Sequence, residues 1–470
     1  MFGQARDVPE QQNSEWKCSI LVVLQMLQVY VTLVSGKRNQ FSMSQSSKVG
    51  DLKCVAQRYF EQGFLKLVTA EGHVLADPMQ SLQAAGLQDG EHLTAVAQQA
   101  KMVATEGAFA IWCHGGRIVT WGRPDSGGDS SEVQDRLRHV QQVHATRFGF
   151  AAILADGSVI SWGKPDFGGD RFAVQDGLRN VQQVHATSFV FVAILADGSV
   201  VTWGDPDFQW DLSDPTIQDQ LRSAKQIQST RGALAAILVD GSIIAEGEPD
   251  FGGDSSAVES QLRSVQEIQA TARAFAAILA DGSVVTWGNS RYGGGSSAVQ
   301  DHLRNAKQVQ ATAAAFAAIV ENGSVVTWGY SEFGGDSFSV QDKLRNAVQL
   351  QSTSCAFAAI LGDGSVVTWG KPAFGGDSSA VADQLRSVQQ IQATVRAFAA
   401  ILADESVVTW GDPDFGGDSS AVKDRLRKVQ QVRATFSAFA AILVDGSVVT
   451  WGNPDEGGES SAVQDQLVDL

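Results

Sequence analysis

Paired carboxylates are the residues of this chain whose types and spacing first suggest chemistry. They occupy loops of the form P-D-F-G-G-D, four residues apart, at Asp166 and Asp170, Asp250 and Asp254, and Asp414 and Asp418. Carboxylate oxygens bind calcium, but that ion takes about six or more oxygen ligands, and two side chains supply too few. The loops therefore predict acidic turns, and we expect no metal and no cofactor.

Histidine and cysteine, the usual residues of nucleophilic catalysis, show no catalytic pattern. Such catalysis needs a nucleophile, a base and an orienting group within hydrogen-bond reach. His144 and His185 stand in the sequence V-H-A-T, which reads I-Q-A-T elsewhere in the chain and indicates a polar strand position. Cys355 replaces an ordinary loop residue. We expect no enzymatic activity and no catalytic residues.

An internal repeat positions the carboxylates, and the dipeptide Trp-Gly marks each copy. Eight copies carry it, at Trp121, Trp162, Trp203, Trp287, Trp328, Trp369, Trp410 and Trp451. The ninth copy reads Glu246-Gly247. Successive copies are 41 residues apart, except that 43 residues separate Trp203 from Glu246. A fixed period of roughly 20–50 residues indicates a solenoid or a propeller.

One copy, residues 265–288, shows the elements of the repeat. VQEIQAT alternates apolar and polar residues like a half-buried strand, and AFAAIL is typical of a strand buried on both faces. Asp281-Gly282 predicts a hairpin turn before the strand SVVTWG. The next loop is expected to lead into about two helical turns opened by a capping box, such as Ser256 and Glu259. In the eighth copy Asp404-Glu405 takes the hairpin position, and we expect strain there.

Repeats of this pattern resemble the regulator of chromosome condensation repeat family. The resemblance covers residues 101–470 and rests on the V-x-x-I-x-A-T strand, the A-I-L-x-D-G-S-V hairpin and the closing W-G, which recur nine times. It implies an all-β propeller. The family's ring has seven blades, whereas nine 41-residue repeats are present here, so we expect seven to nine blades. The family's small residue after Ala is Gly; here it is Thr, as in Thr271 and Thr312.

The first hundred residues are organised differently. Residues 1–27 are expected to form a partly disordered segment, and their apolar run is too short to span a bilayer. Residues 28–97 predict the order strand, strand, helix, strand, strand, and they end with L-x-x-x-G-L-x-x-G-x-x-L. This order resembles the ubiquitin fold, which implies a small α+β ubiquitin-like domain before the propeller.

Charge and cysteine content limit the kinds of partner and the cell compartment that we expect for this protein. The net charge is −17, and nearly all of it belongs to the repeats, so an acidic rim should attract basic proteins and repel nucleic acid. The four cysteines form no C-x-x-C pair, which suits a reducing compartment, cytoplasmic or nuclear, without membrane association. We therefore favour a non-catalytic protein-interaction scaffold.

Two alternatives follow from the resemblance. The founding member of the family is a nucleotide exchange factor for a small GTPase, which implies a regulator of a small GTPase. Large ubiquitin ligases of the HECT class carry the same repeats, which implies a substrate-recruiting relative without the catalytic domain. The near identity of the copies favours the scaffold, because no copy differs enough from the others to supply a distinct set of functional residues.

The copy that contains Glu246 departs from the repeat twice. It also follows the only two-residue insertion, in FQWDLSDPTIQD, which brings Trp210 and Asp211. Either Trp210 compensates structurally for the missing tryptophan while Glu246 points to water, or this blade binds a partner with Trp210 as an aromatic anchor. Both interpretations place Trp210 and Glu246 in one neighbourhood.

An aromatic residue precedes Gly-Gly, or its equivalent, in the seven inner copies. These residues are Phe167, Phe208, Phe251, Tyr292, Phe333, Phe374 and Phe415. The terminal copies have Ser126 and Glu456 instead, as expected where one neighbour is missing. We favour packing between blades over an exposed aromatic ring that binds partners.

Overall fold

The computed structural model describes residues 26–113, 116–169, 178–208 and 214–468. Contacts within the chain divide it into two compact units: the larger one comprises Gln57–Lys66 and the chain from Ala97 onwards, and the smaller one comprises the other residues before Ala97. The two units are taken separately below.

The smaller unit is an α+β fold built on a four-stranded sheet of order β2-β1-β4-β3. Its strands are β1 (Met26–Leu33), β2 (Arg38–Ser44), β3 (Phe64–Thr69) and β4 (His92–Gln98), with α1 (Val49–Phe60) between β2 and β3. β1 pairs antiparallel with β2 and parallel with β4. Val49, Leu52, Ala56 and Phe60 are buried at a spacing of three or four residues, so one face of α1 contributes to the core.

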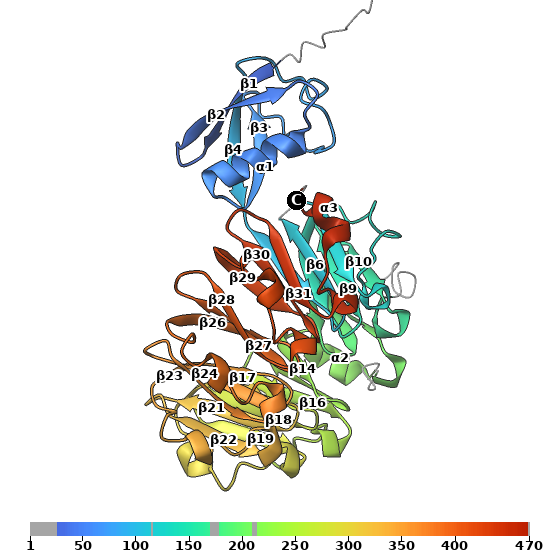
Figure 1. Ribbon diagram of the computed structural model, residues 1–470. Coiled ribbons are helices and arrows are strands. Elements are labelled where there is room, and N and C mark those ends of the chain that lie inside the picture. The colour runs from blue at the N-terminus through green and yellow to red at the C-terminus, as the bar shows by residue number, and fades with distance from the viewer. Residues whose placement is uncertain (1–25, 114–115, 170–177, 209–213, 469–470) are drawn as a thin grey trace, which may run out of the picture. The chain divides into compact units, whose positions relative to one another are not determined.

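The larger unit is a β-propeller of nine three-stranded antiparallel sheets, which we number blades 1 to 9 in chain order (Figure 1). The strands, in sets of three per blade, are Ala100–Ala104, Ala108–Cys113 and Ile118–Gly122 (β5–β7); Val140–Ala145, Gly149–Leu154 and Val159–Gly163 (β8–β10); Val181–Ala186, Val190–Leu195 and Val200–Gly204 (β11–β13); Ala224–Ser229, Ala233–Leu238 and Ile243–Gly247 (β14–β16); Val265–Ala270, Ala274–Leu279 and Val284–Gly288 (β17–β19); Ala306–Ala311, Ala315–Val320 and Val325–Gly329 (β20–β22); Ala347–Ser352, Ala356–Leu361 and Val366–Gly370 (β23–β25); Val388–Ala393, Ala397–Leu402 and Val407–Gly411 (β26–β28); and Val429–Ala434, Ala438–Leu443 and Val448–Gly452 (β29–β31).

Each strand has the burial that its composition predicts. The middle strand is buried on both faces; Ala274, Ala276 and Ile278 face one neighbouring blade, and Phe275 and Ala277 face the other. The first strands of successive blades contact one another around the axis. Because no blade covers both of its own faces, the stacking of neighbours creates the core.

A glycine, a phenylalanine and a tryptophan form the joint between most neighbouring blades. In the joint between blades 4 and 5, the Phe275 and Trp287 rings stack with centroids 5.1 Å apart. The Trp287 indole N–H donates to the carbonyl oxygen of Gly252 in blade 4, at 2.9 Å. Gly252 has φ +90, and a Cβ there would lie 2.7 Å from the Phe275 ring, so only glycine fits. The Trp of the Trp-Gly signature therefore serves to pack neighbouring blades against one another.

The ring closes between blade 9 and blade 1. The Phe436 N–H donates to the carbonyl oxygen of Glu106 at 2.7 Å, and the Trp121 indole N–H donates to the carbonyl oxygen of Gly457 at 3.1 Å. The C-terminal helix α3 (Gln464–Val468) adds Leu467 to the core shared by these two blades. The expected seven to nine blades are therefore nine.

The helical turns expected after each loop are wrong for most blades. In blade 8 the loop is a single 3₁₀ turn, Pro413–Phe415, which ends at Gly416 with φ 85. A second turn, Ser420–Val422, has no side-chain cap. Gly416, in the left-handed conformation, ends the first turn. Leu426 is buried only a few residues after the second turn, so the segment between them is too short for an α-helix. Blade 3 is followed by an α-helix, α2 (Pro215–Leu221).

Candidate functional site

One face of the propeller, the loop face, gathers the residues that the repeat varies. Each first strand ends there in Ala or Ser followed by Thr, and each third strand ends there in Gly. The loop that follows this Gly reads P-D-F in blades 2, 3, 4 and 8 and varies in the other blades. The Thr hydroxyl joins the two, since Thr271 donates to the carbonyl oxygen of Tyr292 at 3.0 Å and Thr394 to that of Phe415 at 2.9 Å. Threonine therefore fixes each loop in place over its own blade.

The aromatic residues of these loops are half-buried. Phe251, Tyr292, Phe333, Phe374 and Phe415 pack against the cores between blades. Arginine guanidinium groups lie over four of these five rings. The Arg396 guanidinium lies 4.8 Å from the Phe374 ring centroid and 4.6 Å from that of Phe415, and the Arg273 guanidinium lies 4.5 Å from that of Phe251. The side chain of Phe208 lies outside the described residues. These rings combine blade packing with cation binding.

The first carboxylate of each predicted pair lies on the loop face. Asp166, Asp250 and Asp414 are exposed. Asp250 lies 2.9 Å from Arg273 of the next blade and accepts a hydrogen bond from the Asn289 amide at 2.8 Å. It therefore links two blades while most of its side chain stays in water.

The second carboxylate of each pair shapes the following turn. Asp254 accepts the backbone N–H of Ser256 at 2.9 Å, and Asp418 accepts that of Ser420 at 2.8 Å. Hydrogen bonds from the Ser256 side chain and backbone lower the pKa of Asp254. The pKa of Asp418 is lowered by the Ser420 backbone and then by its side chain. Asp170 lies outside the described residues.

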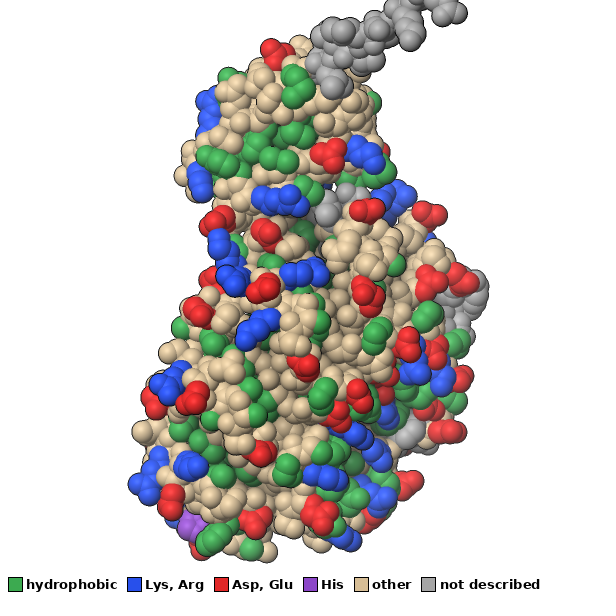
Figure 2. Space-filling view, viewed as in Figure 1, with side chains coloured by type: hydrophobic (Ala, Val, Ile, Leu, Met, Phe, Trp, Pro, Cys, Tyr) green, Lys and Arg blue, Asp and Glu red, His purple; other side chains and the backbone are tan. Residues whose placement is uncertain are grey.

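The acidity of the loop face is concentrated in two arcs. Blades 3 and 4 contribute Asp205, Asp207, Glu248 and Asp250, and blades 8 and 9 contribute Asp412, Asp414, Asp455 and Glu456. Between these arcs the loops carry both signs of charge: the cations Arg123, Lys164, Arg291 and Lys371 and the carboxylates Asp125, Asp166 and Glu332. Acidic and basic side chains are likewise interspersed over the side of the molecule in Figure 2. The acidic rim expected from the repeat is thus divided by cations.

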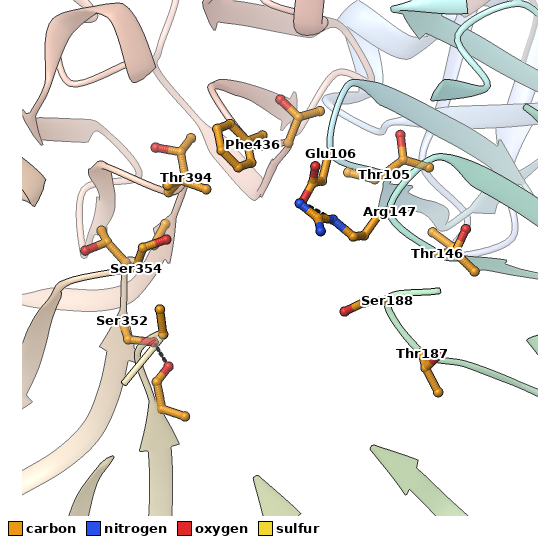
Figure 3. Close-up of a pocket in the computed structure, with 18 of the residues that line it drawn as sticks. Thr105, Glu106, Thr146, Arg147, Thr187, Ser188, Ser352, Ser354, Thr394 and Phe436 are labelled. Atoms are coloured by element: carbon orange, nitrogen blue, oxygen red, sulfur yellow. Dashed lines mark hydrogen bonds and ion pairs between the residues drawn. The ribbon is translucent and has the colours of Figure 1, made fainter. Parts of the chain in front are cut away.

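The axial mouth of the propeller is asymmetric, which the sequence reasoning missed. A cavity of about 590 Å³ is lined mainly by the Ala-Thr ends of the first strands and the residue after each Thr. This residue differs between copies: Glu106, Arg147, Ser188, Arg231, Ala272, Ala313, Ser354, Val395 and Phe436. Arg147 Nε lies 2.6 Å from a Glu106 oxygen, near Phe436, as Figure 3 shows. Variation at one position among near-identical copies was the available signal.

Backbone hydrogen bonds join these axial residues around the ring. In eight of the nine junctions the N–H of the residue after Thr donates to the carbonyl of its counterpart in the next blade, as from Ala313 to Ser354 at 3.0 Å. At the junction of blades 3 and 4, Ser188 donates instead to the Ser229 hydroxyl at 3.4 Å. This junction therefore differs from the others at the axis.

The same junction carries the exceptional Glu246. Glu246 in β16 is half-buried and pairs across the sheet with Leu234. Other blades place Trp opposite Phe at these two positions, so both members of the ring stack are replaced together. Trp210 and Asp211 lie outside the described residues, and their proximity to Glu246 stays a prediction.

Comparisons with known proteins yield structural likenesses only. No family model and no curated protein matches the chain. Among solved structures, Prp20p from Saccharomyces cerevisiae is 14% identical, with a TM-score of 0.34, covering 59% of this chain and 84% of its own. The CRINKLY WD40 ectodomain of the Arabidopsis thaliana receptor kinase ACR4 is 14% identical, with a TM-score of 0.34, covering 56% and 93%. Caldiarchaeum subterraneum ubiquitin is 13% identical, with a TM-score of 0.15, covering 16% and 96%.

The described residues lack two kinds of feature. No helix in this part of the chain has the length and apolarity needed to cross a membrane. Within the same residues, no three metal-binding side chains converge as a cation site would require.

Proposed function

We propose that the chain is a non-catalytic protein-interaction scaffold whose loop face binds basic segments of partner proteins. The observation that carries this proposal is the combination, on one face, of exposed carboxylates and half-buried aromatic rings on loops fixed by threonine hydrogen bonds. Such a surface offers a Lys or Arg side chain a charge partner, next to rings over which the chain's own Arg273 and Arg396 already lie. Because the loops are already ordered, a partner loses little affinity to their ordering.

The two acidic arcs are the expected contact points, since the loops between them carry cations. We propose that residues 28–97 form a ubiquitin-like domain that supplies a second contact surface, in addition to that of the propeller of residues 101–470. A scaffold of this kind would act on protein partners in the cytoplasm or nucleus, without nucleic acid or membrane.

A charge-matched pair of variants tests the loop face. The first changes Asp207, Asp250, Asp414 and Asp455 to Asn and removes exposed loop charges. The control changes Asp301, Asp342, Asp383 and Asp424 to Asn; these residues lie in the connecting segments, and their side chains are 92% exposed or more. On an array of basic peptides, we expect the first variant to bind on the order of tenfold more weakly and the control to match the wild type.

Added salt gives a second readout, because exposed charges are screened within about 10 Å at 0.1 M. Wild-type binding should weaken with salt, and the loop variant should be less sensitive. Equal losses in both variants, or a preference for DNA over basic peptides, would reject the proposal. A nucleotide-exchange assay over a panel of small GTPases separates the scaffold from the alternative, because robust acceleration of nucleotide release would show a regulator.

A further inference from the structure

The axial channel contains a second cavity, which is separate from the loops used above. Its volume is about 570 Å³, and its lining comes mainly from the first strands of blades 8, 9, 1 and 2. Cavities of roughly 300–1,000 Å³ are typical of sites for small ligands. Glutamine dominates the equivalent positions of the repeat, as in Gln308 and Gln310 of blade 6.

Residues that break the repeat gather in this cavity, and most bring N–H groups. Arg433 and His144 stand where blade 6 has Gln310, and Lys101 stands where it has Gln308. Trp112 stands where all other blades have Ile, and it also lines the cavity. The departures add positive charge or a donor, in a chain whose net charge is −17.

Arg433 is a half-buried cation whose assigned hydrogen-bond partners are neutral. Its Nε donates to the carbonyl oxygen of Met102 at 3.2 Å, and its Nη1 donates to that of Val432 at 3.4 Å. Among the described residues, no carboxylate lies within ion-pair distance of it. Burial lowers the pKa of this guanidinium, because the charged form loses water. An anion entering the channel would supply the missing counter-charge.

Two further buried nitrogen atoms, one in the cavity lining and one in blade 3, have no partner among the described residues. The Trp112 indole nitrogen and the Nε2 of His185 are buried, and neither has a hydrogen-bond partner within the described part of the chain. His185 is close enough to His144 for repulsion between the rings to lower the pKa of His144. A buried polar atom without a partner costs about 1–3 kcal/mol. Of these two residues, Trp112 lines the cavity, so the wall carries the unmet hydrogen-bonding capacity of its indole nitrogen.

The glutamine that Lys101 replaces joins neighbouring blades elsewhere in the repeat. In blade 6 the Gln308 amide donates to the carbonyl of Leu350 at 3.1 Å and accepts its N–H at 2.9 Å, which clamps blade 6 to blade 7. Lys101 cannot make this reciprocal pair, because an ammonium group has no acceptor. Blade 1 therefore gives up a structural contact and gains a charge that faces the channel.

We propose that this channel wall binds an oxyanion, the carboxylate or phosphate group of a small molecule or of a peptide. Arg433 and Lys101 supply the charge, His144 and the neighbouring glutamines supply hydrogen bonds, and Met102, Val103 and Trp112 give the remainder of the ligand an apolar wall. The channel's low polarizability relative to bulk water strengthens such ion pairs. This site does not rest on the proposed binding of basic partners to the loop face.

Calorimetric titration of the full chain at constant ionic strength tests the proposal with three probes. Inorganic phosphate and succinate test small oxyanions, and a short peptide with a free C-terminus, compared with its amidated form, tests a peptide carboxylate. We expect at least one probe to bind, and the ranking of the probes identifies the source of the oxyanion.

Variants locate the binding. Arg433→Gln and Lys101→Gln restore the residue that other blades carry, so they should fold; each should weaken binding on the order of tenfold. Lys307→Gln, which removes an exposed cation from the first strand of blade 6, serves as the matched control and should bind like the wild type. Failure of every probe to bind, or equal binding by the wild type and both channel variants with unchanged melting temperatures, would overturn the proposal.

Discussion

At the scale of single residues, the hairpin turn of blade 8 contains a strained glutamate. Glu405 has φ 64, at the position where blade 5 has Gly282 with φ 78. The left-handed conformation costs a residue with a Cβ roughly 1 kcal/mol relative to glycine. We expect Glu405→Gly to raise the free energy of unfolding by about 1 kcal/mol in urea denaturation. Glu321→Gly is the control, because Glu321 is a surface residue outside the left-handed region, and this change should not raise the free energy of unfolding. An equal rise in the control would show that the gain at Glu405 does not come from backbone strain.

A second residue-scale prediction concerns acid stability. Burial, and then repulsion from His185, lowers the pKa of His144 from 6.5 to about 4. Below pH 6.5 the unfolded chain binds a proton that the folded chain refuses, so stability falls as the pH drops from 6.5 towards 4. This difference in proton binding lowers the free energy of unfolding by about 3 kcal/mol as the pH falls from 6.5 to 4.

His144→Gln, which restores the repeat, should therefore flatten part of the pH dependence of unfolding between 4 and 6.5. Burial also lowers the pKa of His185, so His185 accounts for part of the slope that remains. His302→Gln is the control because that side chain is exposed. An unchanged slope in the His144 variant would show that its ring is hydrated in the folded state.

At the scale of elements, the half-buried aromatic rings of the loops have an intermediate role. Phe333 packs against the core between blades 6 and 7, and its ring centroid lies 5.3 Å from that of Tyr330. Phe333→Ala should lower the free energy of unfolding by about 2 kcal/mol. This loss is less than the roughly 3–5 kcal/mol expected for a fully buried ring. Phe338→Ala is the matched control, because Phe338 is 87% exposed. A cost below about 0.5 kcal/mol for Phe333→Ala would favour a ring that serves partner binding alone.

The sequence predicted the elements of the blade because their signals are local. AFAAIL and Asp-Gly specify a doubly buried strand and a tight turn without reference to the rest of the chain. The two helical turns were wrong because a glycine such as Gly416 ends the first turn, and the burial of Leu426 takes up the residues that follow. The capping-box pattern could not reveal that tertiary constraint.

The candidate sites were harder to predict, because ring closure brings together residues that are distant in the sequence. Arg433 and Lys101 share a cavity only because blade 9 meets blade 1. The variation after Thr at the axial mouth was visible in the sequence, but its meaning depends on which strand lies innermost. The Asp pairs were found from the sequence, whereas their separation into a surface carboxylate and a turn-forming carboxylate required the structure.

At the scale of the whole molecule, closure of nine blades makes the first joint equivalent to the internal ones. Trp121 donates to Gly457 at 3.1 Å and stacks on Phe109 with centroids 5.2 Å apart. Trp328 in blade 6 donates to Gly293 at 3.0 Å and stacks on Phe316 at 5.3 Å. In a closed ring, each indole holds two blades together, although 336 residues separate Trp121 from its acceptor.

We therefore expect Trp121→Phe and Trp328→Phe to lower the free energy of unfolding by the same amount, about 2 kcal/mol each. Each change leaves a buried carbonyl without its donor and creates a small cavity beside the remaining ring. Urea denaturation followed by circular dichroism measures both losses under the same conditions. In an open array, Trp121 would face solvent and its replacement would cost almost nothing, so a loss confined to Trp328→Phe would contradict the nine-bladed ring.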